Sequence, residues 1–116
     1  MPTQLARGQV NTILNAVTGT GPGAAYQVPL SQGNGTFGSY STTFAWQVNP
    51  VGTFSGLSVN LEGSLDGVNW SALANNALVG GGLNVVSAAP VPFIRANVLT
   101  FTGGTNVSLL LTVGDV

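Results

Sequence analysis

The chain contains no cysteine, no histidine and no lysine, and its charged residues are very few. They make up 4% of 116 residues, leave a formal net charge of −1, and are Arg7, Glu62, Asp66, Arg95 and Asp115. An average soluble domain carries roughly a quarter of its residues as charged side chains. Without cysteine there is no disulfide-stapled scaffold, and without histidine or lysine the commonest general acids and bases are missing. The composition therefore indicates a building block, and we expect no enzymatic activity.

The scarcity of charge also argues against several kinds of partner. Two arginines are too few to form a phosphate-binding patch, so we expect no nucleic-acid binding. The longest apolar runs, such as residues 109–111, fall far short of the roughly 18 residues of a membrane-spanning helix. The first seven residues have one basic side chain and no apolar run after it, so we expect no signal peptide and no membrane partner.

The chain has the apolar content of a folded domain in spite of its many Gly, Ser, Thr and Asn residues. Hydrophobic residues make up 44% of it, with two Trp, five Phe and two Tyr. Disordered chains combine low hydrophobicity with high net charge, and this chain has neither. At this length we expect one domain, formed by residues 10–116, with residues 1–9 as an N-terminal arm.

Apolar and polar residues alternate through most of the sequence, which is the pattern of half-buried strands. The clearest runs are 44–48, 57–65, 94–98 and 107–113, and weaker ones are 25–30, 69–73 and 83–87. In residues 57–65 we expect Leu57, Val59, Leu61 and Leu65 to share the buried face. Residues 10–17 fit a helical stripe as well as a strand, but their Asn and Thr residues are poor helix formers, so we predict a strand.

Glycine-rich breaks separate these runs, and Asp66-Gly67 is the strongest hairpin signal among them. It predicts a type I′ turn, in which both central residues have positive φ. Seven or eight short strands with such turns indicate an all-β sandwich or a small barrel.

Few motifs in the chain point to a ligand. Residues 33–38 match G-x-G-x-x-G, but a strand-like run follows instead of a helix, so we interpret them as a surface loop. Glu62 and Asp66 are close enough in sequence to approach each other, as a glycosidase pair would. Glu62 is on the polar face of its strand, where no apolar pocket of the kind that a glycosidase acid needs is evident, and the turn explains Asp66. Three carboxylates are also too few for a dedicated calcium site, so we predict no catalytic, cofactor or metal site.

Aromatic residues and glycosylation sequons leave a glycan site open as an alternative. Trp46, Trp70, Tyr26 and Tyr40 could stack on a sugar, although Trp46 belongs to an apolar stripe and is better explained as core. The sequons at Asn34, Asn69 and Asn106 are expected by chance in a chain rich in Asn, Ser and Thr.

The run 63–70, with the pattern S-x-D-G-x-x-W after an aliphatic strand, resembles the discoidin-type jelly roll. That family carries an aromatic–aliphatic–Arg element in a later strand, matched here by Phe93-Ile94-Arg95. With the Thr102-Gly103-Gly104 turn and the Val/Leu-rich last strand, the chain is also similar to small structural proteins of tailed bacteriophages. The resemblance covers roughly residues 57–113. It implies a β-sandwich. Taking it together with the alternating runs, we predict an antiparallel, jelly-roll-like β-sandwich of about eight short strands. From the residues themselves we expect Arg95 to lie across Trp70 or to pair with Glu62.

The sequence thus leads to two hypotheses about function. The first is a non-enzymatic virion protein, a capsid decoration or cement protein that acts as a homo-oligomer, a dimer or trimer, on the major capsid protein. Strands without lysine lack the usual guard against edge-to-edge pairing, and Leu110, on the polar side of its strand, suits an interface. The second hypothesis is a carbohydrate- or receptor-binding module of a phage tail or baseplate.

Overall fold

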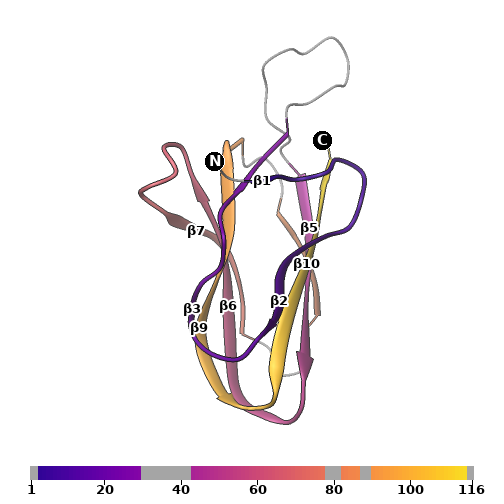
Figure 1. Cartoon of the computed structure of the whole chain (residues 1–116), viewed down its shortest axis with the longest axis vertical. Coiled ribbons are helices and arrows are strands. Elements are labelled where there is room, and N and C mark those ends of the chain that lie inside the picture. The colour runs from indigo at the N-terminus through magenta and orange to yellow at the C-terminus, as the bar shows by residue number, and fades with distance from the viewer. Residues whose placement is uncertain (1–2, 30–42, 78–81, 87–89, 115–116) are drawn as a thin grey trace.

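The computed structural model describes residues 3–29, 43–77, 82–86 and 90–114, and in them it contains strands and no helix (Figure 1). No helix long and apolar enough to cross a membrane occurs among these residues. The strands in chain order are β1 (Thr3–Gln4), β2 (Asn11–Val17), β3 (Gly21–Pro22), β4 (Tyr26–Gln27), β5 (Thr43–Val51), β6 (Phe54–Ser64), β7 (Ser71–Asn76), β8 (Gly82–Val86), β9 (Phe93–Gly103) and β10 (Asn106–Gly114).

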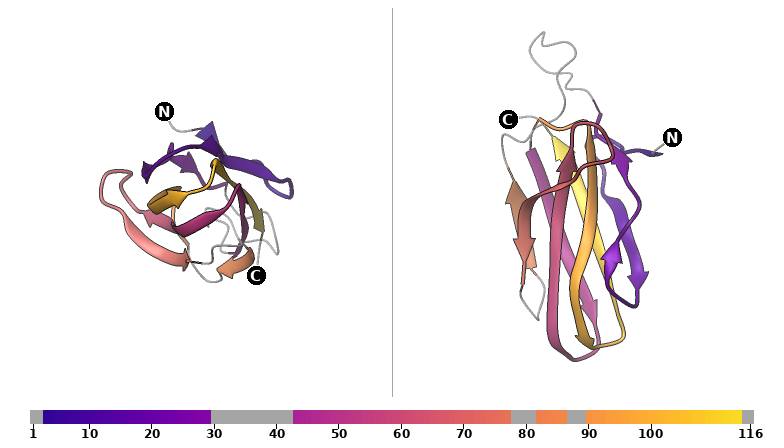
Figure 2. Two further views of the ribbon diagram at one scale, coloured as in Figure 1. Left: turned by 90° about the horizontal axis from the view of Figure 1, so that it is seen from below. Right: turned by 90° about the vertical axis from the view of Figure 1, so that its left-hand side faces the viewer.

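The strands form two sheets that pack face to face (Figures 1 and 2). One sheet has the order β1-β4-β9-β6-β7, with β3 also paired to β9, and the other has the order β2-β10-β5-β8. All pairs are antiparallel except β1 with β4. The pairs β2–β10, β4–β9, β5–β8 and β6–β7 are nested along the chain, which is the winding of a jelly roll. The predicted all-β, jelly-roll-like sandwich is confirmed.

The core lies between the two sheets and is built by the alternating residues of the long strands. The alternation predicts burial correctly at Phe44, Trp46 and Val48, at Leu57, Val59 and Leu61, at Ile94, Ala96 and Val98, and at Val107, Leu109, Leu111 and Val113, all at most 3% exposed. Trp46 is fully buried, so its interpretation as a core residue is confirmed.

The predicted strand at residues 10–17 is confirmed as β2, and its ambiguous pattern has a structural cause. The pairing of β2 with β10 shifts register twice, and Ile13 and Leu14 are both buried although they are adjacent. Ala16 has a positive φ of 50° in the same irregular stretch. A β-bulge adds one residue to a strand and so breaks the period of two. Consequently the apolar spacing of β2 resembles that of a helix.

Two tight turns close the sandwich at one end (bottom of Figure 1). Gly103, the last residue of β9, and Gly104, the first residue of the turn to β10, have φ of 76° and 64°. A Cβ on Gly104 would overlap the ring of Phe54. The backbone amide of Gly104 donates a hydrogen bond to the carbonyl oxygen of Thr53 at 2.8 Å. The β5–β6 turn and the β9–β10 turn therefore pack against each other, which only glycine allows at this position.

Two predictions at the end of β6 are wrong. Leu65 is 76% exposed because β6 ends at Ser64, so Leu65 does not share the buried face of Leu61. Asp66 and Gly67 do not form a two-residue type I′ turn, because β6 and β7 are joined by residues 65–70 and only Gly67 has a positive φ, of 75°. The side chain of Asp66 organises the longer loop instead, as described below.

The remaining predicted segments fall partly outside the described residues. The G-x-G-x-x-G motif at 33–38, the sequon at Asn34 and Tyr40 all lie outside them. Of the residues assigned to an N-terminal arm, 1–9, Thr3–Gln4 pairs with β4 and Leu5 is 3% exposed in the core. This segment therefore contributes a core side chain, and the division at residue 9 stays a prediction.

Candidate functional site

One cluster of polar groups lies on the outer face of the six-stranded sheet, where Glu62 of β6 stands opposite Arg95 of β9. The Arg95 Nε donates to Glu62 Oε1 at 2.7 Å, and Asn97 Nδ2 donates to Glu62 Oε2 at 3.1 Å. The guanidinium also lies 4.5 Å from the ring centroid of Trp70. Both predicted contacts of Arg95, with Trp70 and with Glu62, are therefore present together.

This cluster is built as a structural clamp. Glu62 is only 7% exposed, and both of its carboxylate oxygens accept hydrogen bonds. A buried charge needs this kind of compensation, because an unpaired one would be strongly destabilising. The guanidinium occupies one face of the Trp70 ring. That face of Trp70 is therefore covered and cannot stack on a sugar. Trp46 is fully buried in the core, so neither of its faces can contact a sugar.

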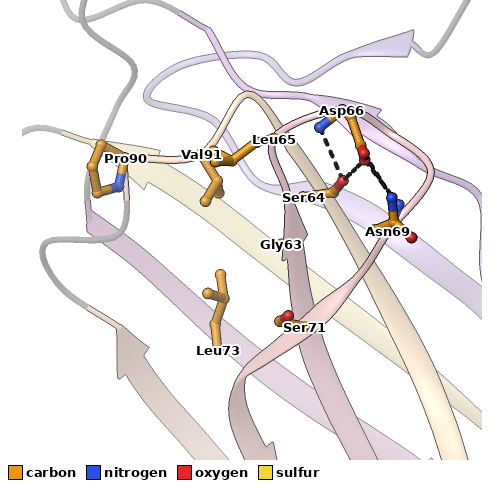
Figure 3. Close-up of a pocket in the computed structure, with 9 residues that line it drawn as sticks. All are labelled: Gly63, Ser64, Leu65, Asp66, Asn69, Ser71, Leu73, Pro90 and Val91. Atoms are coloured by element: carbon orange, nitrogen blue, oxygen red, sulfur yellow. Dashed lines mark hydrogen bonds between the residues drawn. The ribbon is translucent and has the colours of Figure 1, made fainter.

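Asp66 forms a second, separate polar network in the loop 65–70. Its Oδ1 accepts hydrogen bonds from the backbone amides of Val68 and Asn69, each at 2.8 Å, and its Oδ2 accepts one from Asn69 Nδ2 at 2.8 Å. Ser64 Oγ donates to the same carboxylate at 2.9 Å (Figure 3). The backbone amides of Asn69 and Val68, followed by the side chains of Asn69 and Ser64, hold the pKa of Asp66 well below its usual range.

The two carboxylates that sequence places close together thus belong to different networks. No hydrogen bond joins Glu62 to Asp66 in the described part of the chain. Asn69, the asparagine of the sequon at 69–71, donates a hydrogen bond to Asp66 through its side chain. No group of three or more metal-ligating side chains is found among the described residues. The predicted absence of catalytic, cofactor and metal sites stays a prediction.

An open pocket of about 550 Å³ lies beside the loop 65–70 (Figure 3). The loop between β6 and β7 is at the end of the sandwich opposite the tight turns (Figure 1). Its lining is mainly apolar and comes from β6, the loop 65–70, β7 and the segment before β9: Gly63, Ser64, Leu65, Asp66, Asn69, Ser71, Leu73, Pro90 and Val91. Gly63 is part of its wall, and a Cβ there would lie 3.0 Å from the Leu73 side chain. The sequence pattern gives no sign of this pocket, because two separate segments, 63–73 and 90–91, form it together.

A different kind of surface covers the outward side of the sheet β2-β10-β5-β8. We call it the neutral face, and it consists of Val10, Thr12, Ala45, Gln47, Leu83, Val85, Leu110 and Thr112. No charged residue occurs in any of its four strands. Leu83 is 70% exposed, Val85 63% and Val10 65%. A shallow groove of about 100 Å³ lies between Val10 and Leu83, with Leu110 in its lining.

The aliphatic residues of β8 are a sign of this apolar surface that could not be recognised from the sequence. Leu83 and Val85 alternate with Asn84 and Val86, and the register with β5 turns Leu83 and Val85 to the solvent. Leu110, noted in sequence as an apolar residue on the polar side of its strand, is half-buried in the same face. The alternation alone gives no means of telling which face of a short strand such as β8 is the inner one.

The sequence matches no protein-family model and no curated protein. Two solved structures share its fold. The SPBc2 prophage-derived protein YomS superposes with a TM-score of 0.67 and 12% identity over 90% of both chains. The PBSX exported protein XepA superposes with a TM-score of 0.59 and 15% identity over 97% of this chain, which spans 39% of the XepA chain. At these identities the likeness shows the fold alone.

Proposed function

We propose that this chain is a non-enzymatic structural protein of a bacteriophage or prophage particle, and that it stabilises the capsid as a decoration or cement protein. The observation that carries the proposal is the presence of two separate apolar surfaces. One is the neutral face, with Leu83 and Val85 exposed, and the other is the loop 65–70, where Leu65 is 76% and Val68 77% exposed. A protein that joins neighbours needs two contact surfaces.

The energetics of these surfaces favour contact with other protein surfaces. Burying an exposed Leu or Val side chain contributes about 1.5–3 kcal/mol, and neither the neutral face nor its strands contain a charge that would have to be desolvated. The loop 65–70 is held by Asp66, so its two aliphatic side chains are presented by an ordered backbone. Such a loop loses little conformational entropy on binding.

The fold likeness supports a phage origin for the chain. Both similar structures come from prophage-encoded proteins, SPBc2 YomS and PBSX XepA. XepA is described as an exported protein. The location of our chain in the particle, and its contact with the major capsid protein, are therefore the parts of the proposal that an experiment should test first.

The pocket beside the Asp66 loop favours a second candidate function, a receptor- or glycan-binding module of a tail or baseplate. Its volume of about 550 Å³ is within the usual range for small-ligand sites. Among the described residues that line it none is aromatic, and sugars are commonly held by stacking on aromatic rings, so this function is the weaker of the two.

Two measurements test the proposed function. Quantitative mass spectrometry of purified particles from the encoding phage should find the chain at a copy number comparable to that of the capsid protein. Purified chain should also bind empty capsids that lack it, and Leu65→Lys or Val68→Lys should weaken this binding. Absence from the particles, with recovery of the chain in the medium, would contradict the proposal. Binding to glycans instead of capsids, lost on Gly63→Leu, would favour the second function.

A further inference from the structure

The neutral face presents exposed apolar side chains and no charge, a composition that suits contact with another protein surface. The register places Thr12, Leu110, Gln47 and Leu83 in one row across the four strands, and Thr112, Ala45 and Val85 in the next. Leu83 and Val85, on β8, are among the most exposed large hydrophobic residues of the described chain. These two side chains form a ridge at one side of the face, and the groove is the hollow beside it.

The absence of charge restricts what can cover this face. Of the described charged residues, Glu62 and Arg95 belong to strands of the other sheet, Asp66 to the loop 65–70, and Arg7 precedes β2. A partner with charged groups at this position would lose their hydration and find no counter-charge in these four strands. The fitting partner is itself a neutral, partly apolar surface, and the same face of a second copy meets that condition.

We propose that the chain forms a two-fold dimer in which the neutral faces of two copies pack against each other, with Leu83 of each copy in the groove of the other. A two-fold axis brings the same patch of both copies together, so a ridge and a groove on one patch are complementary to themselves. None of the four strands of the face contains a charge that would meet its copy across the axis. The dimer supplies the oligomeric contact of the proposed function and rests on that proposal.

The size of the face sets the strength expected of the dimer. β5 and β10 have nine residues each, or about 30 Å at the rise of a strand, and four strands span about 19 Å. The face therefore covers at most about 600 Å² per copy, which is at the lower limit for specific interfaces. We expect a reversible dimer with a Kd in the range of about 1–100 µM.

Sedimentation velocity of the full chain, from about 1 to 300 µM, tests the dimer. The wild type should pass from monomer to dimer, and Leu83→Lys or Val85→Lys should raise the Kd by about 100-fold or more. The matched controls are Leu65→Lys and Val68→Lys, which place the same charge at equally exposed positions outside the neutral face. They should change the Kd by less than about threefold. Circular dichroism confirms that each variant is folded.

Salt and cross-linking give two independent readouts. Because the interface contains no ion pair, the Kd should change by less than about threefold between about 0.05 M and 0.5 M salt. The chain has no cysteine, so Ala45→Cys, in the middle of the face, can be joined by a bis-maleimide of about 10 Å, the spacing of packed sheets. Val68→Cys should not cross-link under the same conditions.

Three results would overturn the proposed dimer: a monomer over the whole concentration range, dissociation by salt, or loss of association in the loop variants with none in Leu83→Lys. The proposed function fails separately. A chain that dimerises through the neutral face but is absent from particles refutes the particle role and leaves the dimer intact. A chain that stays monomeric but still binds capsids refutes the dimer and leaves the particle role intact.

Discussion

The clamp formed by Glu62, Arg95 and Trp70 offers a quantitative test of how the outer face of the six-stranded sheet is stabilised. The perturbation is Arg95→Met, which keeps most of the aliphatic stem but removes the guanidinium. That group donates to Glu62 at 2.7 Å and lies 4.5 Å from the Trp70 ring centroid. In the variant, Glu62, which is 7% exposed, keeps the hydrogen bond from Asn97 Nδ2 but loses the one from Arg95.

The expected cost lies between the values for exposed and for buried ion pairs. An exposed pair contributes about 0–1 kcal/mol, whereas removing one partner of a fully buried pair costs about 3–5 kcal/mol. The side chain of Glu62 is 10% exposed and that of Arg95 22%. We therefore expect Arg95→Met to lower the free energy of unfolding by about 2–3 kcal/mol, including about 0.5–1 kcal/mol from the lost cation–π contact with Trp70.

The assay is a double-mutant cycle with Glu62→Gln. The free energy of unfolding of each variant is measured by urea titration at pH 7, with tryptophan fluorescence as the signal. Glu62→Gln removes the charge but keeps a hydrogen-bond acceptor. The loss of unfolding free energy in the double variant should therefore be smaller than the sum of the two single losses by about 1–2 kcal/mol. Arg95→Lys serves as the control, because it keeps the charge without the planar donor fork and should restore part of the stability. A coupling energy below about 0.3 kcal/mol would refute the reasoning, since it would show that Glu62 and Arg95 are solvated independently.

Three further predictions concern the core, the Asp66 loop and the tight turns. Leu109→Ala, at a fully buried position, should cost about 2–5 kcal/mol in a denaturant titration, and Leu110→Ala, on the outward side, less than about 1 kcal/mol when measured on the dilute monomer. Asp66→Asn should lower the melting temperature at pH 7. Because the folded pKa of Asp66 is depressed, its contribution is present above its ordinary pKa of 3.8 and is lost as the pH falls through the lowered value, so the difference from wild type should shrink in acid. Gly104→Ala should cost about 2–4 kcal/mol, because it combines a positive φ with overlap on the Phe54 ring.

Each of these predictions has a result that would contradict it. Equal losses at Leu109 and Leu110 would mean that the assignment of an inner and an outer face to β10 is wrong. A difference between wild type and Asp66→Asn that stays constant from pH 7 to about 2 would show that the carboxylate does not organise its loop. For the turn, Gly114→Ala is the control, since a Cβ there meets nothing within 4 Å, and an equal loss at both glycines would remove the steric explanation.

The amino-acid sequence by itself determined the class of fold and most of the core. In β5, β6, β9 and β10 the apolar residues recur at every second position, and this period is dictated by the pleat of the strand, whatever the strand pairs with. The scarcity of charge is likewise a property of composition alone. Both could be read without knowledge of the sheet order.

Only the tertiary structure decided the surfaces and the polar contacts. Glu62 is buried because β9 brings Arg95 and Asn97 beside it from more than 30 residues away. Leu65 is exposed because Ser64 and Asp66 end the strand before it. The neutral face exists because β2, β10, β5 and β8, distant in sequence and all without charge, become neighbours in one sheet. Local periodicity carries no information on which strands will pair, and it is the pairing that gathers separate residues into a surface.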